Sequence, residues 1–144
     1  MHYLKNSFKS IVEFTLKYTA EIYIFLLVFF MLFFLLLMSA SGHGFHFNLN
    51  TKIGYISAIT AIISVLVNKK NINVRIIRVI NNIFLLLSLI VTLTLACIAF
   101  YHNLNFKYGD DVSLLIIFLF FLIPLLFITI NFILLKRVLQ NRLP

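Results

Sequence analysis

The sequence has few charged residues and almost no cysteine. Lys, Arg, Asp and Glu make up 11% of its 144 residues, whereas a soluble domain carries roughly 25%. The single cysteine, Cys97, lies inside an apolar run, so an intrachain disulfide is impossible. These shortages exclude a water-soluble enzyme domain, a secreted disulfide scaffold, a disordered tail and a coiled coil.

Lys, Arg, Asp, Glu and His are missing from the middle of every long apolar run. Ion pathways and proton relays within a membrane depend on such residues, so a pump, an antiporter or an intramembrane protease is not expected. The sequence also lacks a nucleotide-binding glycine loop, a CxxC pair and an HExxH helix. We therefore expect a protein that is not an enzyme and that requires no cofactor.

Apolar residues, by contrast, make up 62% of the sequence, and long apolar runs occur four times. A helix that crosses a bilayer needs about 20 mainly apolar residues. Its backbone groups must also be hydrogen-bonded within the segment. The sequence therefore predicts an all-α membrane protein, with residues 1–144 forming a single four-helix bundle domain. The expected spans are residues 22–41, 51–67, 79–101 and 113–135.

The basic residues are distributed unevenly around these runs. Ten of the twelve lie in the N-terminal segment, the second loop and the tail, whereas Lys52 and Lys107 lie in the other two loops. Basic loops stay in the cytoplasm, so both termini are expected there, with the chain in the inner membrane of a bacterium. A re-entrant second run is the alternative, and it would reverse this charge bias.

The net charge of +8 does not indicate a nucleic-acid partner, because the basic residues lie between apolar runs. Basic side chains beside a bilayer instead attract anionic lipid headgroups. The residues expected to make such contacts are Lys69, Lys70, Arg75 and Arg78.

Residues 1–21 combine a charged face with an apolar face. Lys9, Glu13 and Lys17 recur every four residues, and Phe8 and Ile11 fall on another side of the same helix. This spacing predicts an amphipathic helix that lies at the cytoplasmic interface and leads into the first span. A plain cytoplasmic extension of the first span is the alternative.

Two segments on the expected outer side alternate apolar and polar residues, which is the pattern of a β-strand. They are residues 45–50 and 103–108. Because both lie on one side of the membrane, we expect either a short two-stranded β cap or two irregular loops.

Three histidines, His43, His46 and His102, also fall on this outer side, near Asp110 and Asp111. Imidazole and carboxylate groups together suit zinc or copper. We expect no metal site and take these residues as exposed interfacial side chains. A site built from the three histidines is the alternative.

Small residues form stripes in the second and third spans. Small side chains let membrane helices approach closely, and hydroxyl groups can hydrogen-bond across the contact. These two spans are therefore expected at the centre of the bundle. The predicted packing residues are Gly54, Ala58, Ala61, Ser88, Thr92 and Ala96.

The first span has no such stripe, because it consists almost entirely of bulky residues. We expect it to face lipid or a membrane partner through Phe29, Phe33 and Leu36. In the fourth span, Pro124 removes a backbone donor and should kink the helix. Asn131 should bond another helix or a headgroup.

The size, the four spans, the cytoplasmic ends and the basic C-terminal end Leu134–Arg137 resemble the immunity proteins of colicin A-type pore-forming bacteriocins. This resemblance covers the plan of the whole chain but no specific motif, so it assigns no functional residue. It implies recognition of the toxin's hydrophobic helices within the bilayer. Two alternatives remain open, an accessory subunit of a larger membrane complex and a small oligomeric transporter or lipid-handling protein.

Overall fold

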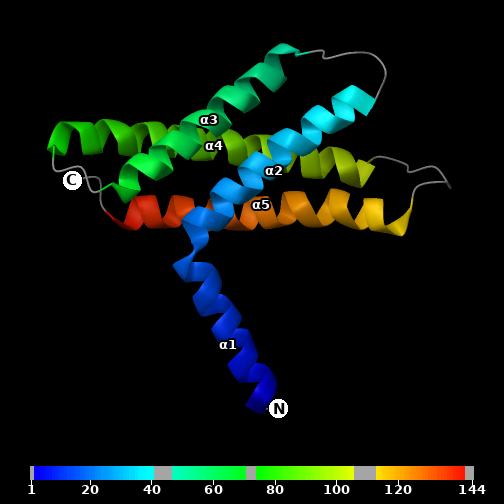
Figure 1. The fold of residues 1–144 in the computed structure, drawn as a ribbon, viewed down its shortest axis with the longest axis horizontal. Helices are drawn as coiled ribbons and strands as arrows, with labels where there is room; N and C mark the ends of the chain where they lie inside the picture. The colour runs from blue at the N-terminus through cyan, green and yellow to red at the C-terminus, as the bar shows by residue number, and fades with distance from the viewer. Residues whose placement is uncertain (1, 41–46, 71–73, 106–112, 142–144) are drawn as a thin grey trace.

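The computed structural model describes residues 2–40, 47–70, 74–105 and 113–141, and within them every regular element is a helix. Figure 1 shows their arrangement. The helices are α1 (His2–Lys17), α2 (Thr19–Ala40), α3 (Leu49–Lys69), α4 (Arg75–Asn105) and α5 (Leu114–Gln140).

Helices α2 to α5 are each long and apolar enough to cross a membrane, which confirms the four predicted spans at that level. Each helix extends beyond its predicted span at one or both ends. The longest, α4, has 31 residues. At about 1.5 Å per residue it is roughly 46 Å long, so it exceeds a hydrocarbon core of about 30 Å.

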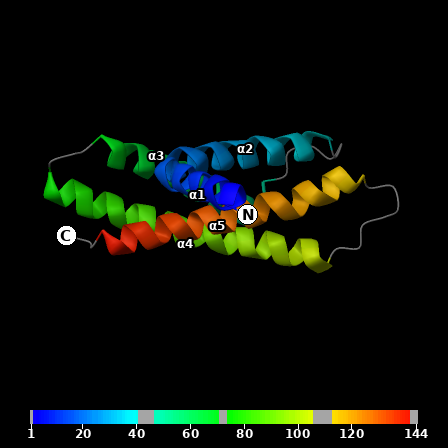
Figure 2. The same ribbon diagram turned by 90° about the horizontal axis from the view of Figure 1, so that it is seen from below.

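The four long helices form a bundle in which α2 and α3 lie over α4 and α5 (Figure 1). Around this bundle, α2 contacts α3, α3 contacts α4, α4 contacts α5, and α5 contacts α2. In contrast, α1 projects away from the bundle at a steep angle, and Figure 2 shows it nearly end-on. The amphipathic helix is thus a separate arm joined to the start of α2.

Small residues of α3 and α4 meet in the core. Of the six residues predicted to pack there, Ala58, Ala61, Ser88, Thr92 and Ala96 are buried. Gly54 is half-buried, and a Cβ atom added to it would lie 3.3 Å from Leu95 Cδ1. A larger residue at position 54 would therefore press against the Leu95 side chain of α4.

The predicted β cap is wrong wherever the structure describes its two segments. Leu49 and Asn50 belong to α3, and residues 103–105 belong to α4. Asn48 is the N-cap of α3, with its side-chain oxygen accepting from the Thr51 amide at 3.0 Å and from the Thr51 hydroxyl at 2.6 Å. This capping satisfies a free helix donor, which favours a helix start over a strand. Residues 45, 46 and 106–108 lie outside the described residues.

The helix expected over residues 1–21 is interrupted at Tyr18, so α1 ends four residues early. A helix end leaves carbonyl groups without an intrahelical donor. Here the buried Thr19 hydroxyl donates to the carbonyls of Thr15 and Leu16, at 2.7 and 3.0 Å. The Arg137 guanidinium of α5 also donates to the Leu16 carbonyl. These contacts stabilise the bend and attach it to the C-terminal half of α5.

An ion pair joins the start of α2 to the end of α3. Glu21 lies in the first turn of α2 and pairs with Lys69 of α3. Both side chains are about half exposed, so solvent screens the attraction between them and the pair contributes little to stability. On α1 itself, Lys9 and Glu13 form the expected ion pair at 3.9 Å. The pair at Glu21 therefore joins α2 to α3 and is not part of α1.

Pro124 lies within α5 and cannot donate to the carbonyl of Phe120, four residues earlier. The Asn103 side chain of α4 replaces that donor, with its Nδ2 atom 2.6 Å from the Phe120 oxygen. An uncompensated carbonyl in hydrocarbon would be costly. The Phe120 carbonyl that Pro124 leaves without a donor is thus hydrogen-bonded to Asn103, and this bond links α4 to α5.

We expect Asn103→Ala to lower the free energy of unfolding by about 0.6–1.7 kcal/mol, the range for hydrogen bonds between membrane helices. In a Pro124→Ala background the same change should cost less, because the residue 124 amide again bonds Phe120. A double-mutant cycle measured by unfolding in mixed micelles tests this coupling. The control is Asn105→Ala, since Asn105 bonds Tyr101 within its own helix. Additive costs would contradict this account of Asn103.

Candidate functional site

A buried polar cluster joins three helices in the middle of the bundle. It consists of Tyr23 on α2, Thr92 on α4 and Asn131 on α5, all buried. The Tyr23 hydroxyl lies 3.3 Å from Thr92 Oγ1, and Asn131 Nδ2 lies 2.9 Å from the same atom. Thr92 is therefore the shared partner of the other two side chains.

The donor of each bond follows from the chemistry of a hydroxyl, which has one proton and two lone pairs. Thr92 directs its proton to the carbonyls of Ser88 and Leu89 in its own helix, at 2.8 and 3.1 Å. Its two lone pairs then accept from Tyr23 and Asn131. The hydrogen-bonding capacity of Thr92 is fully used.

Asn131 is only partly satisfied. Its side chain is completely buried, and its Oδ1 atom has no hydrogen-bond partner among the described residues. The expectation that Asn131 bonds another helix agrees with its contact to Thr92 on α4. The cluster carries no charge, so it can hold helices together but offers no acid or base.

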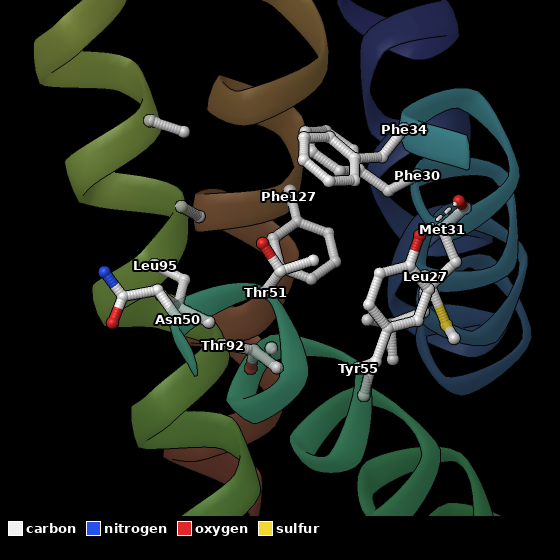
Figure 3. Close-up of a pocket in the computed structure, with 14 residues that line it drawn as sticks. Leu27, Phe30, Met31, Phe34, Asn50, Thr51, Tyr55, Thr92, Leu95 and Phe127 are labelled. Carbon is white, nitrogen blue, oxygen red and sulfur yellow. Dashed lines mark hydrogen bonds between the residues drawn. The ribbon is translucent and has the colours of Figure 1, made fainter. Parts of the chain in front are cut away.

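Next to this cluster lies an apolar cavity of about 280 Å³. Figure 3 shows its two sides, with Leu27, Phe30 and Met31 of α2 facing Leu95 and Thr92 of α4. Phe127 of α5 lies behind the cavity. Small residues of α3 and α4 leave the space open, namely Gly54, Ala58, Ala96 and Ala99. Polar residues Asn50 and Thr51 line the part nearest the start of α3.

One hydrogen bond ties α2 to α3 beside the cavity. The Tyr55 hydroxyl donates to the Met31 carbonyl at 2.9 Å. Both residues line the cavity. This bond therefore joins the two helices at the edge of the cavity.

The surface of α2 carries a row of aromatic rings. Phe25, Phe29 and Phe33 follow one another at centroid distances of 6.4 and 6.1 Å. Phe29 and Leu36, two of the predicted partner-facing residues, are exposed, with Leu36 at 67%. Phe33 is half-buried and its ring lies 6.4 Å from that of Phe120 on α5. The exposed part of the face is thus centred on Phe25, Phe29 and Leu36.

Of the three histidines, the structure describes His102 alone. It is exposed in the last turn of α4, and its ring lies 6.2 Å from that of Tyr101. Within the described parts of the chain, no group of three metal-binding side chains comes together. His43, His46, Asp110 and Asp111 lie outside those residues.

The basic residues expected at lipid headgroups gather around the turn between α3 and α4. Lys69 pairs with Glu21, and Lys70 is the C-cap of α3. Arg75 and Arg78 are exposed in the first turn of α4. This end of the bundle is therefore positively charged.

The fold and this site are those of a small multi-pass helical membrane protein whose helices are joined by buried side-chain hydrogen bonds. Comparison with family models, with curated proteins and with solved structures finds no match to the chain. Tyr23 and Asn103 are not among the residues predicted from the sequence, although a tyrosine or asparagine within an apolar run is a signal for such bonds.

Proposed function

We propose that this protein is a non-enzymatic inner-membrane protein that binds an apolar helix of another protein within the bilayer. The best specific candidate for the bound protein is a pore-forming bacteriocin, which would make the chain an immunity protein. In this proposal both termini are cytoplasmic, and the charged end around Lys70 and Arg75 contacts anionic headgroups.

The observation that carries this proposal is the exposure of α2. In the candidate span of α2, 17% of the residues are buried, against 28% in each of the other three. Phe25 and Leu36 are each 67% exposed. A helix this open in an isolated chain has a large apolar surface left for lipid or for a partner helix.

Association within a bilayer depends on packing detail, because lipid tails are as apolar as the side chains that they meet. The stacked rings of Phe25 and Phe29 form a shaped surface rather than a smooth one. At its start α2 is held by the Glu21–Lys69 pair, and further along it is held by the bond from Tyr55. A shaped surface on a helix that is fixed in position can select one partner helix over others.

The test is expression of the chain in cells sensitive to pore-forming bacteriocins, including any toxin encoded beside its gene. Depolarisation of the inner membrane is the readout. We expect protection against one toxin, and Phe29→Ala with Leu36→Ala should abolish it. Phe33 is left unchanged in this variant because its contact with Phe120 would confuse loss of packing with loss of binding.

A matched control is the double change Ile56→Ala and Ile63→Ala, which trims two exposed residues of α3. It should leave protection intact at equal expression. Replacing His43, His46 and His102 by Gln should also leave it intact, because recognition would be between apolar helices. Failure to protect against any toxin would overturn the immunity proposal. If protection were lost on replacing the histidines but not on replacing Phe29 and Leu36, the result would point to a metal site instead.

A further inference from the structure

We propose that the cavity between α2, α3 and α4 holds one acyl chain of a bilayer phospholipid. The proposal concerns a lipid site and does not rest on the helix-binding function, so each can fail without the other. It follows from the polarity of the cavity lining, from the cavity volume and from the position of its polar residues.

The first argument is that the cavity offers little to water. A buried water needs two to four polar partners. Thr92 has its proton and both lone pairs engaged, and the Tyr55 hydroxyl donates to Met31. The other residues that line the cavity away from Asn50 and Thr51 are apolar. A hydrocarbon occupant leaves no donor of these lining side chains without a partner.

The second argument is size. An apolar cavity of roughly 150 Å³ in a soluble protein holds a benzene molecule. This cavity, of about 280 Å³, is nearly twice as large. It therefore has room for a segment of roughly a dozen carbon atoms, which is a large part of one acyl chain.

The third argument is the arrangement of the lining. Gly54, Ala58 and Ala99 create the space, and the cavity is partly open, so that a chain can enter from the side. Asn50 and Thr51, in the first turn of α3, lie where the polar end of the lipid would be. This combination fits a phospholipid better than a free hydrocarbon.

Bound lipid can be measured by native mass spectrometry of the full chain extracted from membranes in mild detergent. We expect one retained phospholipid per wild-type chain. Ala99→Phe places a ring in the cavity and should lower this retention about tenfold. Cys97→Phe is the matched control, because Cys97 lies two residues away on the exposed face of α4. It should retain lipid as the wild type does.

A second measurement uses the wild-type chain, so it does not depend on how Ala99→Phe folds. The chain is reconstituted in vesicles of phosphatidylethanolamine and phosphatidylglycerol, with a trace of phospholipid that carries a diazirine at its chain end. Crosslinks should map to Ala58 and Ala96, which bulk lipid cannot reach because both are buried. The proposal is overturned if these residues are not labelled. It is also overturned if no phospholipid is retained, or if the retained molecule is a free fatty acid or a second copy of the chain.

Discussion

Thr92→Val is expected to lower the free energy of unfolding by about 1–3 kcal/mol although it removes no heavy atom, because it leaves buried polar groups unpaired. Valine has nearly the shape of threonine, so the change creates no cavity. It deprives both the Tyr23 hydroxyl and the Asn131 amide of their acceptor. Two contacts between helices are therefore lost with one side chain.

Thr94→Val is the matched control for this effect. Thr94 lies on the same helix, is exposed, and donates only to the Ile90 carbonyl within its own helix. Its substitution should change stability by no more than about 0.5 kcal/mol. Unfolding titrations in mixed micelles provide the measurement. Equal costs for Thr92→Val and Thr94→Val would show that the cluster does not hold α2, α4 and α5 together.

Asn131→Leu should cost less than Thr92→Val. Leucine removes the amide together with the unpaired Oδ1 atom, and replacing a poorly satisfied polar group by an apolar one of similar size can be almost neutral. The order of these two costs distinguishes a cluster centred on Thr92 from one in which all three residues contribute equally.

Ala61→Leu is expected to destabilise the bundle by about 1–3 kcal/mol, the usual cost of overpacking. Ala61 has 0% exposure and lies in the core with Val65, Leu85 and Leu89. Three additional carbon atoms at this position must push α3 away from α4.

The control for Ala61→Leu is Cys97→Leu, which enlarges a small side chain on the exposed face of α4. Lipid can move aside there, so its stability should match that of the wild type. The same mixed-micelle titration compares the two variants. If the two variants have equal free energies of unfolding, then the close contact of α3 with α4 is absent from the protein.

Much of the fold could be predicted because a bilayer imposes a length and an apolar composition on each helix. The predicted span 113–135 lies almost entirely within α5, Leu114–Gln140. The β cap was wrong because alternation over six residues is a weaker signal than the capping asparagine within it. Asn48, directly before the apolar run of α3, already indicated where a helix begins.

The partners of the side-chain hydrogen bonds between helices could not be predicted, because these bonds join residues far apart in the sequence. Tyr23 and Thr92 are 69 positions apart, and Thr92 and Asn131 are 39 positions apart. Ala61 and Ala96 were both predicted to be packing residues. In the structure Ala61 is closed off in the core, whereas Ala96 borders the cavity. That difference depends on how α2 and α3 lie over α4. The periodicity of one helix carries no information about this arrangement.

In the proposed topology, four helices cross the membrane and both ends of the chain lie in the cytoplasm. Single cysteines in a Cys97→Ala background test it, using a membrane-impermeant maleimide on intact spheroplasts. We predict that cysteines at Asn48 and Ser113 are labelled at once, whereas those at Lys70 and Asn141 are labelled only after lysis. Labelling at Asn141 in intact spheroplasts would contradict the account.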